Sequence, residues 1–366
     1  MKRAFKSYST ALILLIVGSC VDPFKLPELS GAPQLVVDGL ITTDPGPHKV
    51  KLSLSFTINE SSGPEVTGAT LSILDDLGNV VFLNEISAGE YQVIPESWQA
   101  QIGRSYRLRI QLLDGRQYES TDQLVYSAGS IDSIYFAYTK NAIKSTDQSS
   151  ETDAFIGYIN SSGSAELPNL FRWRWKGTYE IFTRPELTTT AIPGCCLVPD
   201  PLPCSGYNTN LEPVQPCTCC TCWIDEFSNK AIVSENEFSN DNRFWGVEFG
   251  KIPVDGLRFY NKYHMEVEQL SLDESAYTFW KLVKAQQSGA TNIFQPNAIR
   301  IQGNVRNIND SHELVLGVVS FSSVVRATKF IYPSDIQGSS KPDLPVLIID
   351  CRNYSSTSTN VKPPFW

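Results

Sequence analysis

The sequence predicts a mostly β protein, with an N-terminal β-sandwich followed by a larger antiparallel β domain that carries a cysteine-rich loop excursion and one amphipathic helix. Short runs in which apolar and polar residues alternate recur along the chain, and turn-forming residues separate them. Abundant threonine, serine, valine and tyrosine favour strands over helices. Seven of the nine cysteines lie between Cys195 and Cys222, where no periodic pattern is present. These observations together indicate two β domains in one chain.

The first residues have the pattern of a lipoprotein signal peptide. Three cations precede a short apolar run, and Gly18 and Ser19 stand directly before Cys20. A transmembrane anchor would need about twenty apolar residues, which this run does not supply. The sequence therefore predicts a signal peptide at 1–19, a lipid-modified Cys20 that attaches the protein to a membrane, and a proline-punctuated tether within 20–33.

The composition limits the classes of partner. The net charge is −9 and the isoelectric point is about 5.0. Because phosphate binding requires a basic face, a nucleic-acid partner is excluded. Without its signal peptide the chain has about 346 residues, a length typical of two domains.

Residues 34–127 are predicted to form the β-sandwich. Val50, Leu52 and Leu54 alternate with polar residues, and the stretch 106–112 alternates in the same way. Turn-forming residues separate these runs at 44–47, 62–64, 75–79 and 114–115. With the stretches 66–73 and 103–108, the pattern resembles the immunoglobulin-like or prealbumin-like modules of secreted bacterial proteins.

The second predicted domain, 128–366, contains an aromatic-rich strand at 171–176. Three aromatic residues alternate there with three cations, so Trp173 and Trp175 share one face. An amphipathic strand with its aromatics in the core accounts for this pattern, and a tryptophan platform for a ligand is the alternative. Trp173, Trp175 and Trp223 are therefore the candidates for ligand or partner contacts.

A cysteine-rich insertion is predicted at 185–242. Eight cysteines remain after Cys20, and an even number outside the cytoplasm is typical of disulfides. The alternative is a zinc site at 217–222, but structural zinc sites usually bring two separated ligand pairs of reduced thiolates. The sequence leaves the pairing open among Cys195, Cys196, Cys204, Cys217, Cys219, Cys220, Cys222 and Cys351.

One helix is predicted at 272–288. Ser271 and Glu274 have the spacing of a capping box, and Lys281 and Lys284 suit the helix C-terminus. Apolar residues fall on one face, which is expected to pack on the second domain: Leu272, Ala276, Phe279, Trp280 and Val283.

An ordered set of short motifs resembles a family of uncharacterised Bacteroidota outer-membrane lipoproteins. The set comprises Cys20-Val21-Asp22-Pro23-Phe24, Tyr277-Thr278-Phe279-Trp280, Ala285-Gln286-Gln287-Ser288-Gly289, Asn292-Ile293-Phe294-Gln295-Pro296, Gly303-Asn304-Val305-Arg306-Asn307, Glu313-Leu314-Val315-Leu316-Gly317 and Lys362-Pro363-Pro364-Phe365-Trp366. The members have a domain of unknown function and are often encoded beside TonB-dependent receptors. The resemblance implies an outer-membrane location and a TonB-dependent receptor as partner. It supplies no catalytic residue.

The sequence contains no motif for catalysis, for a cofactor or for a metal, and its three histidines, His48, His264 and His312, are isolated. The leading hypothesis is therefore a non-enzymatic accessory lipoprotein that captures a ligand for a TonB-dependent transporter. A structural or assembly partner of an outer-membrane complex is the second hypothesis, and a surface hydrolase is the third. The first predicts an aromatic-lined pocket, the second a flat complementary surface, and the third converging titratable groups.

Overall fold

The computed structural model describes residues 33–56, 62–145, 150–164, 168–235, 239–240, 242–289, 301–338 and 342–366. The predicted signal peptide, Cys20 and residues 20–32 of the tether lie outside these ranges. One compact unit extends from Gln34 to Trp366 and contains the elements described here. Within the described ranges, no helix is both long and apolar enough to cross a bilayer.

The first sheet has ten strands and encloses a core of its own. Its strands are β1 (Leu35–Thr42), β2 (Lys49–Leu54), β3 (Thr70–Asp75), β4 (Val80–Ser87), β5 (Glu90–Val93), β6 (Ser105–Gln111), β7 (Gln117–Ser120), β8 (Gln123–Leu124), β19 (Val305–Asn307) and β20 (Leu316–Ser322). The predicted alternation is confirmed, because Val50 and Leu52 of β2 are fully buried while Lys51 between them is exposed.

The first sheet also contains residues from the C-terminal part of the chain. Strand β20 pairs in parallel with β1, and β19 pairs antiparallel with β7. The other edge of β20 accepts and donates hydrogen bonds through the side-chain amides of Gln123 and Asn304. The range 34–127 therefore supplies eight of the ten strands, and the sheet is completed by residues beyond it.

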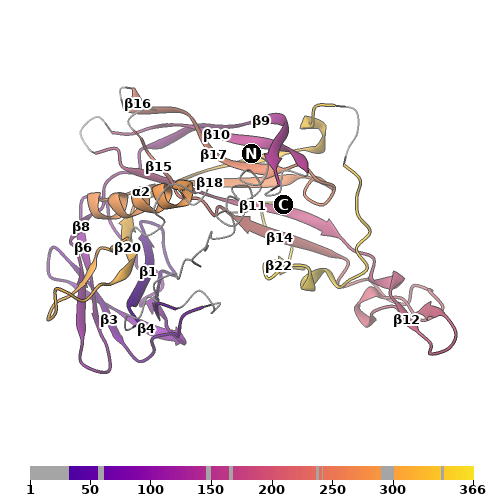
Figure 1. Cartoon of the computed structure of the whole chain (residues 1–366), viewed down its shortest axis with the longest axis horizontal. Coiled ribbons are helices and arrows are strands. Elements are labelled where there is room, and N and C mark those ends of the chain that lie inside the picture. The colour runs from indigo at the N-terminus through magenta and orange to yellow at the C-terminus, as the bar shows by residue number, and fades with distance from the viewer. Residues whose placement is uncertain are drawn as a thin grey trace, which may run out of the picture. The chain divides into compact units, whose positions relative to one another are not determined.

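Two further sheets pack face to face around a second core (Figure 1). The four-stranded sheet has the order β16 (Ser239–Asn240), β17 (Arg243–Pro253), β10 (Glu151–Ser162) and β9 (Ser130–Lys144). The other sheet has the order β21 (Val324–Ile331), β18 (Tyr263–Ser271), β11 (Phe171–Phe182), β14 (Thr221–Phe227) and β22 (Ser358–Thr359), with β15 (Ile232–Val233) paired to β11. The predicted mostly β class, with two β parts, is thereby confirmed.

The second core depends on a glycine that faces a tyrosine across two strands. Gly177 of β11 lies so close to Tyr263 of β18 that a Cβ atom would fall 1.8 Å from the phenol oxygen. The phenol itself is fully buried and donates a 2.5 Å hydrogen bond to Glu226, which also binds Arg258. Only glycine leaves room for this ring against the strand.

Helix α2 (Glu274–Gly289) is the one α-helix among the described residues. The predicted cap was wrong: Asp273 is the capping residue, and its carboxylate accepts from the N–H groups of Ser275 and Ala276. Ser271 instead remains in β18, paired with Phe171. The apolar face of α2 contacts β20 of the first sheet as well as β11 and β15.

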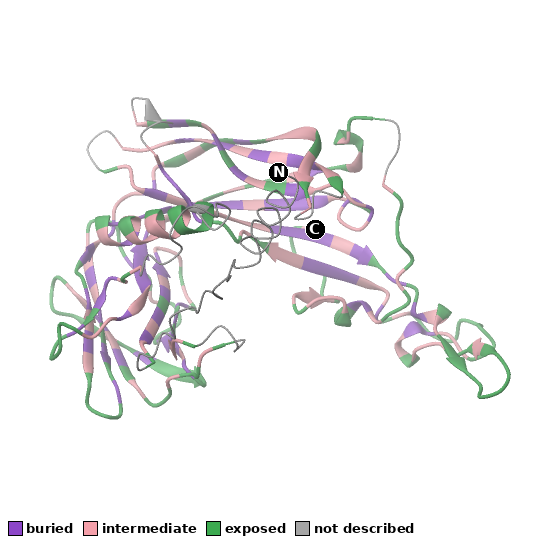
Figure 2. Cartoon of the chain, viewed as in Figure 1, coloured by how far each residue is buried: buried purple, intermediate pink, exposed green. Residues whose placement is uncertain are grey.

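The cysteine-rich excursion runs over residues 185–220, here called the arm (Figure 1). It contains the hairpin β12 (Thr189–Ala191) and β13 (Leu197–Pro199) and two 3-10 turns, η1 (Pro185–Leu187) and η2 (Pro203–Ser205). The arm is shorter than the predicted 185–242, because β14 starts at Thr221 and pairs with β11. Figure 2 shows the hairpin mostly as exposed residues, so the arm buries little core of its own.

Candidate functional site

A cavity of about 560 Å³ lies where the two sheets of the second core present free edges. Strand β9 ends one sheet and β21 ends the other, and among the described residues each pairs with a single strand, β10 and β18 respectively. The 3-10 turn η4 (Pro333–Asp335) follows β21 and forms part of the wall. The lining residues are Phe136, Ala137, Tyr138, Phe155, Lys329, Phe330, Ile331, Ser334, Asp335 and Gln337.

Aromatic rings form much of the cavity wall. Phe136 packs edge-on against Phe249 with ring centroids 5.9 Å apart, and Tyr138 packs edge-on against Phe155 at 5.7 Å. Phe136 and Tyr138 are only partly buried and present apolar surface to the cavity, whereas the buried Phe155 borders it. Such walls bind apolar or ring-shaped parts of a ligand.

Polar groups converge on the same cavity. The Lys329 ammonium extends from β21 toward β9 and donates to the carbonyl of Ile134 at 3.4 Å. The Asp335 carboxylate accepts from the N–H of Tyr332 at 2.8 Å, which fixes it at the end of β21. A cation and an anion at one aromatic-lined opening can orient a polar ligand.

The phenol of Tyr138 is held by a carboxylate at the margin of the cavity. Its hydroxyl donates to Asp153, and this hydrogen bond raises the pKa of Tyr138 and lowers the pKa of Asp153. Asp153 also accepts from the N–H of Asn141 at 2.9 Å. The tyrosine therefore stays neutral and its ring orientation is fixed.

The three tryptophans singled out from the sequence do not line this cavity together. Trp173 is fully buried and donates to Gln269 at 2.7 Å, so the core interpretation holds for it. Trp175 is half-buried and donates to the carbonyl of Phe249 at 3.0 Å. Trp223 lies on the outer face of its sheet, edge-on to the C-terminal Trp366 with centroids 6.4 Å apart.

The eight remaining cysteines form four pairs, as the even number predicted. The pairs are Cys195 with Cys196, Cys204 with Cys219, Cys217 with Cys220, and Cys222 with Cys351. The last pair links β14 to the C-terminal segment across 129 residues of sequence. The arm is therefore cross-linked internally and its base is tied to the tail.

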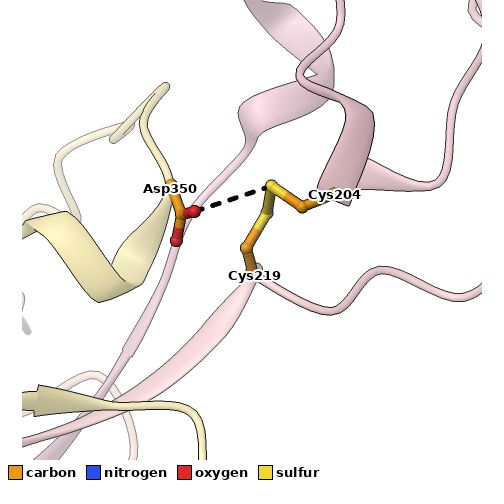
Figure 3. Close-up of side chains that lie close together, drawn as sticks. All are labelled: Cys204, Cys219 and Asp350. Carbon is orange, nitrogen blue, oxygen red and sulfur yellow. Dashed lines mark hydrogen bonds between the residues drawn. A yellow bond between two sulfur atoms is a disulfide. The ribbon is translucent and has the colours of Figure 1, made fainter.

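One cluster combines two cysteines with a carboxylate. Figure 3 shows Asp350 pointing toward the Cys204–Cys219 disulfide, with a carboxylate oxygen 3.8 Å from the Cys204 sulfur. Metal binding would require free thiolates. Because both sulfurs are in a disulfide, the cluster offers no thiolate to a metal ion.

The histidines lie in separate places. His48 is buried and contacts the carbonyl of Asp44 at 2.9 Å, and burial lowers its pKa. His264 stacks on Phe365 at 4.0 Å, and burial, with the nearby lysines, lowers its pKa also. His312 is exposed in a turn beside Asp310.

The sequence pattern predicts one wall of the cavity but not the cavity itself. In the sequence, Ile134, Phe136 and Tyr138 alternate with other residues and so share one face of a strand, which in the structure faces the second core. Lys329 and Asp335 carry no comparable signal, because they meet β9 only through the packing of two sheets.

Comparison with known families gives one match. Residues 21–328 match the model of a family described as a domain of unknown function. No curated protein matches the chain.

Proposed function

The chain belongs to this family, DUF4249, and on that premise we propose that it is a non-enzymatic outer-membrane lipoprotein that captures a ligand for a TonB-dependent transporter. The cavity between β9 and β21 carries the ligand-capture part of the proposal. Its volume of about 560 Å³ lies within the range of small-molecule sites, and it joins aromatic walls to a few polar groups.

The membrane part of the proposal is supported by the sequence. The leader before Cys20 has the order of cations, apolar run and small residues that directs lipid attachment. Four disulfides are consistent with export to an oxidising compartment. Two or more acyl chains would retain the protein stably at a membrane surface.

A second candidate function is a structural partner in an outer-membrane complex. The arm favours it, because it is cross-linked and exposes large apolar side chains: Leu187, Ile192, Leu197, Leu211 and Val214. Exposed apolar surface of this kind marks protein interfaces. Capture of a ligand and docking on a transporter use different surfaces, so the two functions are compatible.

The partner is tested by gentle detergent extraction of the acylated full-length protein from its own outer membrane, followed by mass spectrometry. We expect stoichiometric recovery of a TonB-dependent transporter. Recovery of assembly machinery would favour the structural function, and extraction of the protein alone would refute the partnership.

The cavity is tested with the ligand that the recovered transporter imports. Phe136→Ala removes a ring that lines the cavity, whereas Tyr135→Ala removes an exposed ring from the opposite face of β9. Calorimetry should show binding to the unmodified protein and to Tyr135→Ala, with weaker binding in Phe136→Ala. Equal binding by both variants would place the ligand elsewhere.

A further inference from the structure

The segment 344–349 has exposed apolar side chains on a nearly unpaired backbone. Leu344, Val346, Ile348 and Ile349 are 41%, 64%, 47% and 38% exposed. Among the described residues, only two backbone groups of this segment have hydrogen-bond partners: the Leu347 carbonyl accepts from the N–H of Arg184 at 2.6 Å, and the Ile348 carbonyl accepts from the hydroxyl of Thr188.

The segment is nevertheless held in place. Leu347 packs against the second core, and Cys351 directly beyond the segment is joined to Cys222 of β14. The Cys351 N–H also donates to the carbonyl of Cys219 at 3.0 Å. The segment is fixed in position, its backbone groups are mostly unpaired and its exposed side chains are apolar. Such a segment is a preorganised template for another strand.

We infer that residues 344–349 form a docking site for an extended β-strand of a partner protein, added through backbone hydrogen bonds beside the disulfide-linked arm. The partner strand carries apolar residues that face Val346 and Ile348, and it is flanked by lysine or arginine. The inference rests on the proposed function in taking the partner to be a protein, and it names the surface that the partner binds.

Charge determines the ends of the partner strand. Over residues 184–220 and 342–352 there are five carboxylates and two guanidinium groups. Within these two ranges both arginines are in ion pairs, Arg184 with Glu186 and Arg352 with Asp350. Asp343, in contrast, is exposed at the start of the segment. Cations at the ends of the partner strand would complement this surface.

The same charges argue against two other occupants. Antiparallel pairing of 344–349 with a second copy would set Asp343 opposite Asp350, which already pairs with Arg352, so the facing position gives Asp343 no cation. Burial of this segment in lipid would leave the backbone N–H groups of Val346 and Ile348 without partners, which is costly in a bilayer. A strand from a different protein can bring a cation to Asp343 and can accept hydrogen bonds from the backbone N–H groups of Val346 and Ile348.

The test uses the purified full-length protein and a fluorescent peptide of alternating valine and threonine with an arginine at each end. Fluorescence anisotropy should show binding, and amide hydrogen exchange at Val346 and Ile348 should slow. A peptide with glutamate at both ends should bind at least about tenfold more weakly. A backbone N-methylated peptide, which lacks the donors of a strand, should not bind.

Two variants of the exposed segment distinguish strand addition from non-specific hydrophobic binding. Val346→Pro removes one backbone donor, and Val346→Thr keeps it as the matched control. We expect loss of binding in the first and retention in the second, with Asp343→Arg reversing the preference toward the glutamate peptide. Disulfide mapping verifies the fold of each variant.

Three results would overturn the inference: full binding of the N-methylated peptide, full affinity in Val346→Pro, or a dimer of the protein that Val346→Pro abolishes. The experiment needs neither a transporter nor its ligand. Failure here therefore leaves the proposed function standing, and failure of the transporter pulldown leaves strand binding measurable.

Discussion

The side-chain amide of Asn304 makes both hydrogen bonds that a neighbouring strand would offer to Val319. Its nitrogen donates to the Val319 carbonyl at 2.8 Å, and its oxygen accepts from the Val319 N–H at 3.1 Å. Gln123 extends this edge by donating to the same carbonyl at 3.1 Å and accepting from the Phe321 N–H at 3.3 Å. Two amide side chains thus complete the edge of β20 without a further strand.

Asn304→Ala should destabilise the fold by about 1–3 kcal/mol, because it leaves the buried N–H of Val319 unpaired. The free energy of unfolding in denaturant measures the effect. Asn309→Ala is the control, since that side chain is exposed, and it should change stability by less than about 0.5 kcal/mol. Equal effects of the two variants would contradict the role of Asn304.

Acid should weaken the second core through Glu268. Burial by itself would raise the pKa of Glu268, but the ion pairs with Arg174 and Arg326 outweigh burial and hold the pKa below its ordinary 4.5. A depressed folded-state pKa contributes stability above pH 4.5 that is lost as the pH falls through the folded value.

Denaturation of the unmodified protein and of Glu268→Gln should therefore differ most at neutral pH and converge in acid. Glu248→Gln, at an exposed site, is the matched control and should follow the unmodified protein. A constant difference between Glu268→Gln and the unmodified protein across the whole pH range would refute the electrostatic explanation.

Removal of the Cys222–Cys351 disulfide should cost more stability than removal of the Cys204–Cys219 disulfide. The first closes a loop of 129 residues and the second a loop of 15. Loop-closure entropy predicts losses of about 5 and 3 kcal/mol, respectively, for the paired alanine variants. Chemical denaturation under oxidising conditions measures both, and the reverse order would contradict the loop-length explanation.

Gly177→Ala should destabilise the second core by about 1–3 kcal/mol, since the new methyl group would overlap the Tyr263 phenol. A double-mutant cycle with Tyr263→Leu checks the cause, because the shorter side chain leaves the position of the phenol oxygen empty. The combined loss should then be smaller than the sum of the single losses. Additive losses would place the strain elsewhere.

Local pattern explains which parts of the fold could be predicted. The alternation around Val50 and Leu52 predicted β2, and the aromatic and cationic residues at 171–176 predicted the buried and outer faces of β11. The position of β20 beside β1 could not be predicted, because a parallel pairing across most of the chain leaves no periodic trace in sequence. The capping-box spacing of Ser271 and Glu274 predicts a cap two residues before Asp273, whose carboxylate caps the helix in the structure.

The candidate site was less predictable than the fold. Alternation puts Phe136 on the core side of its strand, but it does not reveal that no strand of the described residues pairs with the outer edge of β9. The cavity exists because two sheet edges meet without forming a ladder, and sheet order is a property of the whole chain. The cysteine count indicated disulfides correctly, whereas the pairing depended on which strand ends lie together.

Strand β20 is synthesised late, and this limits when the first sheet can fold. A chain made from its N-terminus leaves one edge of β1 without its partner for most of synthesis, since the parallel neighbour β20 ends only at Ser322. The first sheet therefore cannot complete its folding until residues 316–322 have been synthesised. Premature termination after 127 would release a fragment with an open, apolar β1 edge, a substrate for chaperones and proteases rather than a stable domain.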